Sequence, residues 1–137
     1  MKCLQEAITN ALLHRDYSAY MQNRPVELKL FPDRIEIVSP GGLFGLATVD
    51  DLYHGMSHVR NPVMVSIMRA LSTSEEPVGG IHLMNAELHK LGVPSVQFRD
   101  DIDSVTTTIF LLKPTLNDSP LKREGFRPIG SFSNRSG

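Results

Sequence analysis

Apolar and polar residues alternate with two different periods along this chain, and the periods predict where helices and strands lie. Residues 2–14 place apolar side chains at the spacing of an amphipathic helix. Residues 26–31 (VELKLF) and 34–39 (RIEIVS) alternate apolar and polar positions, which is typical of strands. Pro32-Asp33 lies between them as a turn dipeptide, so we expect an antiparallel β-hairpin.

The second half of the chain continues this mixture. Thr48 is expected to cap a short helix with two acids in its first turn, and Asn61-Pro62 to begin another helix as N-cap and first-turn proline. A further helix is expected from about Ile81, ending at Gly92. Two β-rich segments follow, at 95–98 and 104–112, separated by an acidic turn (RDDID).

The same periods select the core and the fold class. The first helix is expected to pack on the hairpin sheet, and the helix from Ile81 to point three side chains inward. The core positions predicted in this way are Ile8, Ala11, Leu12, Met84, Leu88 and Leu91. The result is an α+β fold with helices packed on one face of a mostly antiparallel sheet.

The 137 residues fit one domain, which we place at residues 1–112. Residues 113–137 hold proline, serine and arginine without a period, and are expected to be an extended or disordered tail that contributes little to the fold. Because the chain opens almost directly into a helix, we expect a domain taken from a longer chain.

Composition narrows the function only slightly. The net charge of −1 gives no support for nonspecific nucleic-acid binding. The single cysteine, Cys3, excludes an internal disulfide and suits a reducing, cytoplasmic compartment. No apolar run approaches the roughly 18 residues that a membrane span requires, so no membrane partner is expected.

Glu6, Asn10 and His14 are spaced by four and form one polar stripe on the predicted helix. An amide oxygen can coordinate magnesium, and a carboxylate one turn away can orient or deprotonate water, so the stripe suits a magnesium–phosphate site. The alternative is a solvated helix face, which the spacing alone favours.

Two glycine pairs are the other candidates. Gly41 and Gly42 follow the second strand, and Gly79 and Gly80 precede the helix at Ile81. Backbone N–H groups at such positions can approach an anionic ligand. A plain turn and a flexible joint explain the same residues.

The order of these pieces resembles a known family. ALLHRDYS is followed by a hairpin closing in RIEIVSPGGL, by a threonine-capped acidic helix, by a helix opening with RNP, and by a Gly-Gly-Ile helix start. This order is similar to the C-terminal domain of RecG-related transcriptional regulators, often called ATP-dependent DNA helicase-like. The resemblance covers about residues 4–112, and no helicase motor motif is present. In full-length members the domain follows an AlbA-like domain, which implies DNA as a partner through a missing N-terminal domain.

That family is in turn similar to the gyrase–chaperone–histidine kinase–MutL ATPases, with their Bergerat-type two-layer sandwich. The resemblance implies that Asn10 binds magnesium and that Glu6 activates water. It implies nucleotide contacts at the two glycine pairs. His14 is a further candidate for nucleotide binding, and the alternative is that His14, Arg15 and Asp16 are structural and tie the helix end to the hairpin.

The aspartate that reads adenine in those ATPases is replaced here by Ser39. At the third motif the RecG-related family usually has Gly-Thr-Gly-Ile, and Val78 replaces its first glycine.

These departures favour a regulatory domain that binds ATP and magnesium weakly or not at all, with hydrolysis less expected than binding. The first rival is an active magnesium-dependent ATPase with Glu6 as its base. The second is a ligand-free dimerisation or scaffold module, so a homo-oligomer is a second expected partner.

Overall fold

The computed structural model describes residues 2–45, 47–54, 59–71, 80–112 and 130–133. The predicted order of helices and strands is confirmed within residues 2–112, whereas the last strand lies in the region predicted as a tail. The elements are α1 (Lys2–His14), β1 (Glu27–Leu30), β2 (Arg34–Pro40), α2 (Val49–Tyr53), α3 (Pro62–Leu71), α4 (Gly80–Lys90), β3 (Gln97–Asp101), β4 (Ser104–Phe110) and β5 (Gly130–Ser133).

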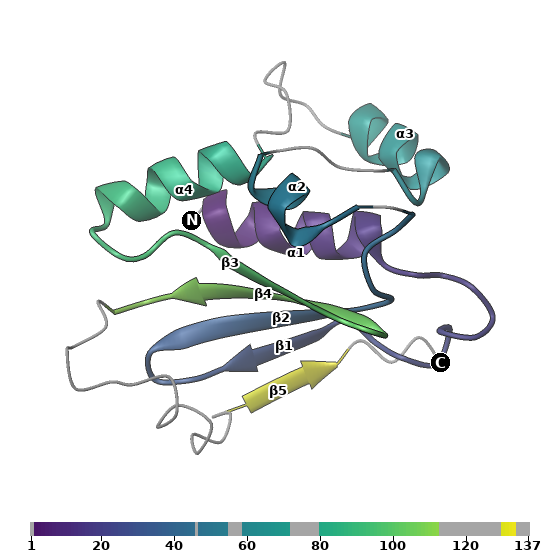
Figure 1. Cartoon of the computed structure of the whole chain (residues 1–137), viewed down its shortest axis with the longest axis horizontal. Helices are drawn as coiled ribbons and strands as arrows, with labels where there is room; N and C mark the ends of the chain where they lie inside the picture. The colour runs from purple at the N-terminus through teal and green to yellow at the C-terminus, as the bar shows by residue number, and fades with distance from the viewer. Residues whose placement is uncertain (1, 46, 55–58, 72–79, 113–129, 134–137) are drawn as a thin grey trace.

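The strands that the structure describes form one antiparallel sheet in the order β3-β4-β2-β1-β5. Figure 1 shows α1 and α4 side by side over one face of this sheet. The expected α+β fold, with helices on one face of an antiparallel sheet, is therefore confirmed.

The predicted hairpin is β1 and β2. Glu27 pairs with Val38 and Leu30 with Ile35, and the Phe31 N–H donates to the Arg34 carbonyl over 2.9 Å to close the turn. Thr48 caps α2 as predicted: its hydroxyl accepts from the Asp51 N–H, and the Asp51 carboxylate accepts from the Thr48 N–H. This reciprocal pair is a capping box.

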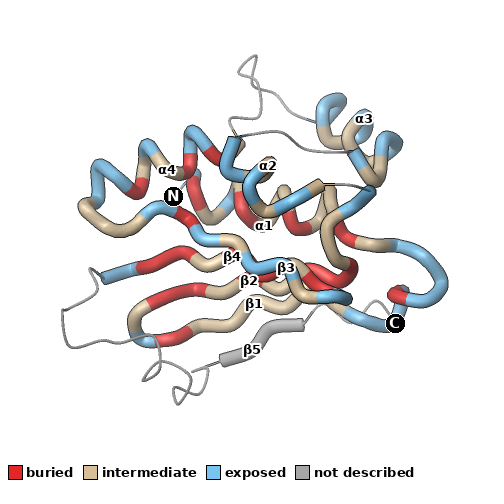
Figure 2. Tube along the Cα trace, in the orientation of Figure 1, coloured by how far each residue is buried: buried red, intermediate tan, exposed pale blue. Residues whose placement is uncertain are grey.

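The core lies between the two helices and the central strands, where Figure 2 shows the buried positions. Helix α1 buries Cys3, Ala7 and Ala11, whose spacing of four puts them on one face. The predicted Ala11 is therefore confirmed in the core, and Ile8 is half-buried against it. The Cys3 thiol is buried, which raises its pKa to about 11, and its backbone N–H donates to the Glu87 carboxylate. The other fully packed members are Ile35, Ile37, Ile81, Met84, Leu88, Val96 and Ile109.

One core prediction on α4 is wrong. Leu91 is 64% exposed, although Met84 and Leu88 are buried as expected. The helix ends one residue earlier, and Gly92 takes φ +69°, so that the Val93 N–H bonds back to the Leu88 carbonyl over 3.2 Å. This Schellman-type ending brings Val93 against the core in place of Leu91.

The acidic stretch after β-rich residues 95–98 is also different from the expectation. Its first three residues belong to β3, since Asp100 pairs with Val105 and Asp101 with Ser104. Only Ile102 and Asp103 are left for the turn, because the hairpin register requires just two connecting residues.

Helix α3 carries its apolar face away from the core. Val59, Val63, Ile67 and Leu71 are spaced by four and are 48–72% exposed, and no residue of α3 is buried. Among the described residues nothing covers this face, which we name the α3 stripe.

The predicted tail contains one described element. Strand β5 pairs with β1, with Leu28 opposite Phe132, and so extends the sheet at the β1 edge. Residues 113–129 and 134–137 lie outside the described residues.

Deleting residues 113–137 is expected to lower the melting temperature by less than about 8 °C, because β5 adds one short edge strand beyond the buried core. Deleting only 134–137 keeps β5 and serves as the control. A larger loss, seen by differential scanning calorimetry only in the longer deletion, would show that the tail is part of the fold.

Candidate functional site

A pocket of about 140 Å³ lies where the second half of α1 meets the turn after β2 and the first turn of α4. Its floor is formed by the sheet, because alternate residues of β2 and β4 point toward the helices. The lining residues are Asn10, Ala11, His14, Ser39, Gly41, Gly42, Leu43, Phe44, Ala47, Leu52, Gly80, Ile81, Phe98, Val105 and Thr107.

Most of the site residues expected from the sequence meet in this pocket. They come from three separate segments of the chain, and the structure brings them to one place. Those that line the pocket are Asn10, His14, Ser39, Gly41, Gly42 and Gly80. Glu6 is adjacent, since its carboxylate accepts from the Gly80 N–H over 3.1 Å. Gly79 lies outside the described residues.

The polar stripe of α1 is not a solvated face. Glu6, Asn10 and His14 are all half-buried, because α4 and the turn after β2 lie beside α1. Burial lowers the pKa of His14, and the nearby Arg60 guanidinium lowers it further. His14 is therefore a neutral imidazole near pH 7, able to donate one hydrogen bond and to accept another.

Ser39 is buried, and its hydroxyl donates to the Ala11 carbonyl over 2.8 Å. Ser39 therefore ties β2 to α1. Because the hydroxyl proton of Ser39 is already used in this hydrogen bond, the oxygen can only accept a further one, and the group carries no charge.

Hydrogen bonds to residues in and beside the β3–β4 turn fix the position of the turn after β2. Gly41 has φ +90°, and its N–H donates to the Asp103 carbonyl over 2.7 Å. The Leu43 N–H donates to the Asp100 carboxylate over 3.0 Å. We name residues 40–43 the glycine turn. Two of its N–H groups are thus already paired, and a carboxylate lies beside it.

The HRDYS segment builds the loop that follows α1. Arg15 is buried, and its guanidinium donates to the carbonyls of Asp16, Met21, Gln22 and Arg24 at 2.6–3.3 Å. The Asp16 carboxylate accepts from the Ser18 N–H, which lowers the pKa of Asp16. The Asp16 N–H donates to the Pro40 carbonyl and so ties the loop to the hairpin. Arg15 and Asp16 therefore act as structural residues.

The carbonyl groups at the end of α1 are satisfied by side chains from elsewhere in the chain. The Tyr17 hydroxyl donates to the Leu12 carbonyl, and the Asn61 amide donates to the carbonyls of Leu13 and Arg15 at 2.7 and 2.8 Å. Asn61 was expected to cap the helix that follows it. Asn61 does stand at the start of α3, where its carbonyl accepts from the Val65 N–H over 3.1 Å, and its side-chain nitrogen also closes the end of α1, where helix carbonyls lack partners of their own.

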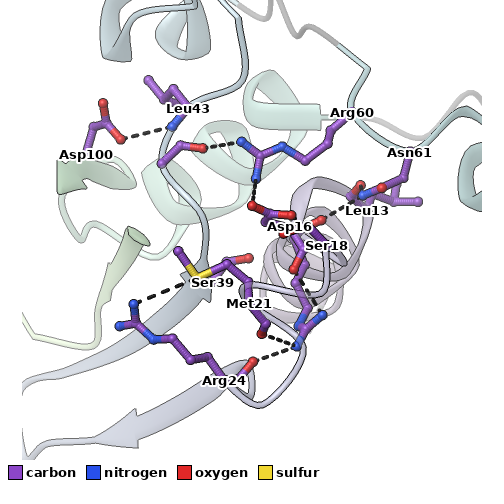
Figure 3. Close-up of polar contacts among 12 residues, drawn as sticks. Leu13, Asp16, Ser18, Met21, Arg24, Ser39, Leu43, Arg60, Asn61 and Asp100 are labelled. Carbon is purple, nitrogen blue, oxygen red and sulfur yellow. Dashed lines mark hydrogen bonds and ion pairs between the residues drawn. The ribbon is translucent and has the colours of Figure 1, made fainter. Parts of the chain in front are cut away.

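Arg60 is the residue of this region that the sequence reading missed. Its guanidinium donates to the Gly42 carbonyl over 2.7 Å, lies 3.9 Å from the Asp16 carboxylate, and stacks 5.2 Å above the Phe44 ring. Figure 3 shows it between the end of α1 and the glycine turn. The RNP string is the available signal, but as a pattern it predicts only the start of a helix.

The side chains of the site supply too few ligands to hold magnesium on their own. Asn10 offers one amide oxygen, and no group of three or more histidine, cysteine or acidic side chains able to hold a metal occurs in the described part of the chain. Magnesium is commonly held by one or two protein groups, with water and phosphate oxygens completing its shell. The site therefore suits magnesium that arrives with a phosphate ligand. No helix in the described ranges is long and apolar enough to cross a membrane.

The sheet, the covering helices and the pocket at their junction define an ATPase-like α+β domain. Residues 23–109 match the family described as "Putative ATP-dependent DNA helicase recG C-terminal", and the chain belongs to that family. The matched range begins after α1, so the stripe of Glu6, Asn10 and His14 lies outside it.

A solved structure shares the fold. The DIP2311 protein from Corynebacterium diphtheriae superposes with a TM-score of 0.71 at 24% identity, over 84% of this chain. The match spans 24% of the DIP2311 chain, so this chain corresponds to about a quarter of that protein's length. No curated protein is similar enough to this chain to count as a relative.

Proposed function

We propose that this domain binds a magnesium-complexed purine nucleotide in the pocket and serves as a regulatory domain of a longer, DNA-acting protein. The observation that carries the proposal is the meeting of Asn10, His14, Ser39, both glycines of the turn and Gly80 in one cavity. Those positions were selected from the sequence through their likeness to ATPase motifs, and nothing in the sequence alone required them to be neighbours.

The size of the pocket indicates which part of a nucleotide it holds. Drug-sized ligands occupy pockets of roughly 300–1,000 Å³, whereas an apolar cavity of about 150 Å³ accepts benzene. The pocket of about 140 Å³ therefore holds only part of a nucleotide, and its apolar walls Phe44, Leu52 and Phe98 are where the base would lie. The phosphates would lie at its open side.

Asn10 is the proposed magnesium ligand, and the bound metal would neutralise part of the phosphate charge. The carboxylate of Glu6, the candidate catalytic base, accepts from the Gly80 N–H at the start of α4. This bond anchors the start of α4. It also occupies a carboxylate oxygen that would otherwise be free to accept a proton from water. Binding with slow or absent hydrolysis is therefore the function that we favour over an active ATPase.

The wider setting follows from the family. The chain covers about a quarter of the solved relative, so DNA contact would be made by another domain of the longer protein. A cytoplasmic location and assembly into homo-oligomers belong to the same proposal. The exposed α3 stripe supports the alternative of a ligand-free dimerisation or scaffold module.

Calorimetric titration with ATP and GTP, each with and without magnesium, tests the proposal. Both nucleotides are expected to bind in the submillimolar range with magnesium, and with less than a hundredfold preference. Ser39 cannot supply the carboxylate that would accept from the adenine amino group, because a hydroxyl carries no charge and this one already donates to Ala11.

Two outcomes would contradict this reading. A preference for ATP above a hundredfold would show that other groups read the base. No binding of either nucleotide at millimolar concentration would leave the scaffold alternative, with the α1 stripe as a structural feature.

A further inference from the structure

Arg60 contacts three separate parts of the site. One guanidinium nitrogen, Nη2, donates to the Gly42 carbonyl in the glycine turn, and the other, Nη1, faces the Asp16 carboxylate beyond the end of α1. The cation also lies above the ring of Phe44, at the edge of the pocket. Its side chain is only 13% exposed.

The contacts of the Arg60 guanidinium leave one of its nitrogen atoms without a hydrogen-bond partner. Arg60 Nη1 is buried and makes no hydrogen bond within the described residues, and the ion pair at 3.9 Å is longer than a charge-assisted hydrogen bond. A buried donor without a partner is unfavourable, and such a group in a native fold requires an explanation. The firm contacts of Arg60 are therefore those with the Gly42 carbonyl and the Phe44 ring.

The glycine turn is shaped around this side chain. A Cβ added at Gly41 would lie 2.2 Å from Arg60 Nη1 and 2.5 Å from the Asp16 Cβ. Glycine at this position is favoured by the positive φ and by the closeness of the Asp16 Cβ, whereas the Arg60 guanidinium is the end of a flexible side chain that would have to move. The pocket lining contains Gly41, Gly42, Leu43 and Phe44, so Arg60 contacts one wall of the pocket directly.

We propose that Arg60 is the positioning residue of this site, holding the glycine turn and Phe44 in the arrangement that forms the pocket. It acts on a ligand through these residues and is not itself part of the lining. The effect on affinity rests on the proposed nucleotide function, whereas the effect on the glycine turn does not.

The same contact links the pocket to α3. Arg60 and Asn61 immediately precede α3, and both are bound to the body of the domain, at Gly42 and at the carbonyls of Leu13 and Arg15. Helix α3 itself buries no residue. A movement of α3 would therefore reach the pocket wall through Arg60.

The test uses Arg60→Met and Arg60→Lys, with Arg69→Met on the exposed side of α3 as the matched control. The ligand-free readout is the set of backbone amide signals and exchange rates of residues 41–44 in ¹H–¹⁵N spectra. We expect these to change in both Arg60 variants, because neither side chain can bridge the Gly42 carbonyl and Asp16 together. The ligand readout is titration with magnesium-ATP, in which both variants are expected to bind at least tenfold more weakly than wild type.

A second pair of variants addresses the same contact without changing the arginine. Gly41→Ala and Gly45→Ala both place a side chain at a positive φ, of +90° and +69°, but an added Cβ meets no atom within 4 Å at Gly45. Gly41→Ala is expected to alter the amide signals of residues 42–44, and Gly45→Ala to leave binding within twofold of wild type.

Unchanged amide signals in Arg60→Met would overturn the proposal, as would full recovery of affinity in Arg60→Lys. Equal losses in Arg69→Met would also overturn it, because they would show a general effect of removing positive charge. If wild type binds no nucleotide, the proposed function fails, and the ligand-free spectra still decide the role of Arg60.

Discussion

Replacing Arg15 with methionine is expected to destabilise the domain by about 3 kcal/mol, the largest stability loss that we predict for a single polar side chain here. Hydrogen bonds to charged groups contribute roughly 1.5–3 kcal/mol, and buried acceptors that lose their donor add a desolvation cost. The Arg15 guanidinium serves four backbone carbonyls of the loop after α1, so removing it leaves the whole loop without its central donor.

The measurement is urea unfolding followed by circular dichroism. Arg99→Met is the matched control, because Arg99 is 69% exposed and pairs only with Asp101 among the described residues, where an exposed ion pair contributes roughly 0–1 kcal/mol. Equal midpoints for the two variants would show that water replaces the guanidinium in the loop without loss.

Replacing Asn10 with alanine is expected to abolish magnesium-dependent nucleotide binding, a loss of at least a hundredfold in affinity. Asn10 is the amide on α1 that reaches the pocket, so the variant removes the proposed protein ligand of the metal. Glu6→Gln is expected to bind nearly as wild type, because the glutamine oxygen can still accept from the Gly80 N–H. Only turnover, where present, should fall, since a water-activating base stabilises the transition state.

Calorimetric titration with and without magnesium measures both variants. Gln5→Ala is the control, because Gln5 is exposed on the same helix. Retained magnesium dependence in Asn10→Ala would place the metal elsewhere, and loss of binding in Glu6→Gln would show that the negative charge of Glu6 is itself needed.

The sequence predicted this fold well where a single period governs the local structure. The hairpin of β1 and β2 follows from strict alternation around a turn dipeptide, and α1 from a regular apolar face. The errors come where a local rule competes with another. Leu91 continues the apolar period of α4, but Gly92 takes a left-handed conformation and ends the helix. Val93 therefore packs against the core in the place expected for Leu91.

The sequence predicted which residues belong to the candidate site, but it did not predict the hydrogen bonds that these residues make. Asn10, His14 and the glycines of the turn were selected by spacing and resemblance, and they do line one pocket. The bonds from Ser39 to Ala11 and from Arg60 to Gly42 join side chains to distant backbone carbonyls. A backbone carbonyl is present at every position, so no residue pattern marks which one a distant side chain will reach.

The reactivity of the buried Cys3 thiol can be used to measure local opening of the domain at α1. Cys3 is the single cysteine of the chain, and it lies in the core beside α4, with its backbone tied to Glu87. Burial keeps a thiol reagent away from Cys3 until the surrounding packing opens, and the pKa of about 11 keeps the thiol protonated at neutral pH. The labelling rate therefore measures how often the first turn of α1 opens, and a ligand that stabilises α1 should slow the reaction.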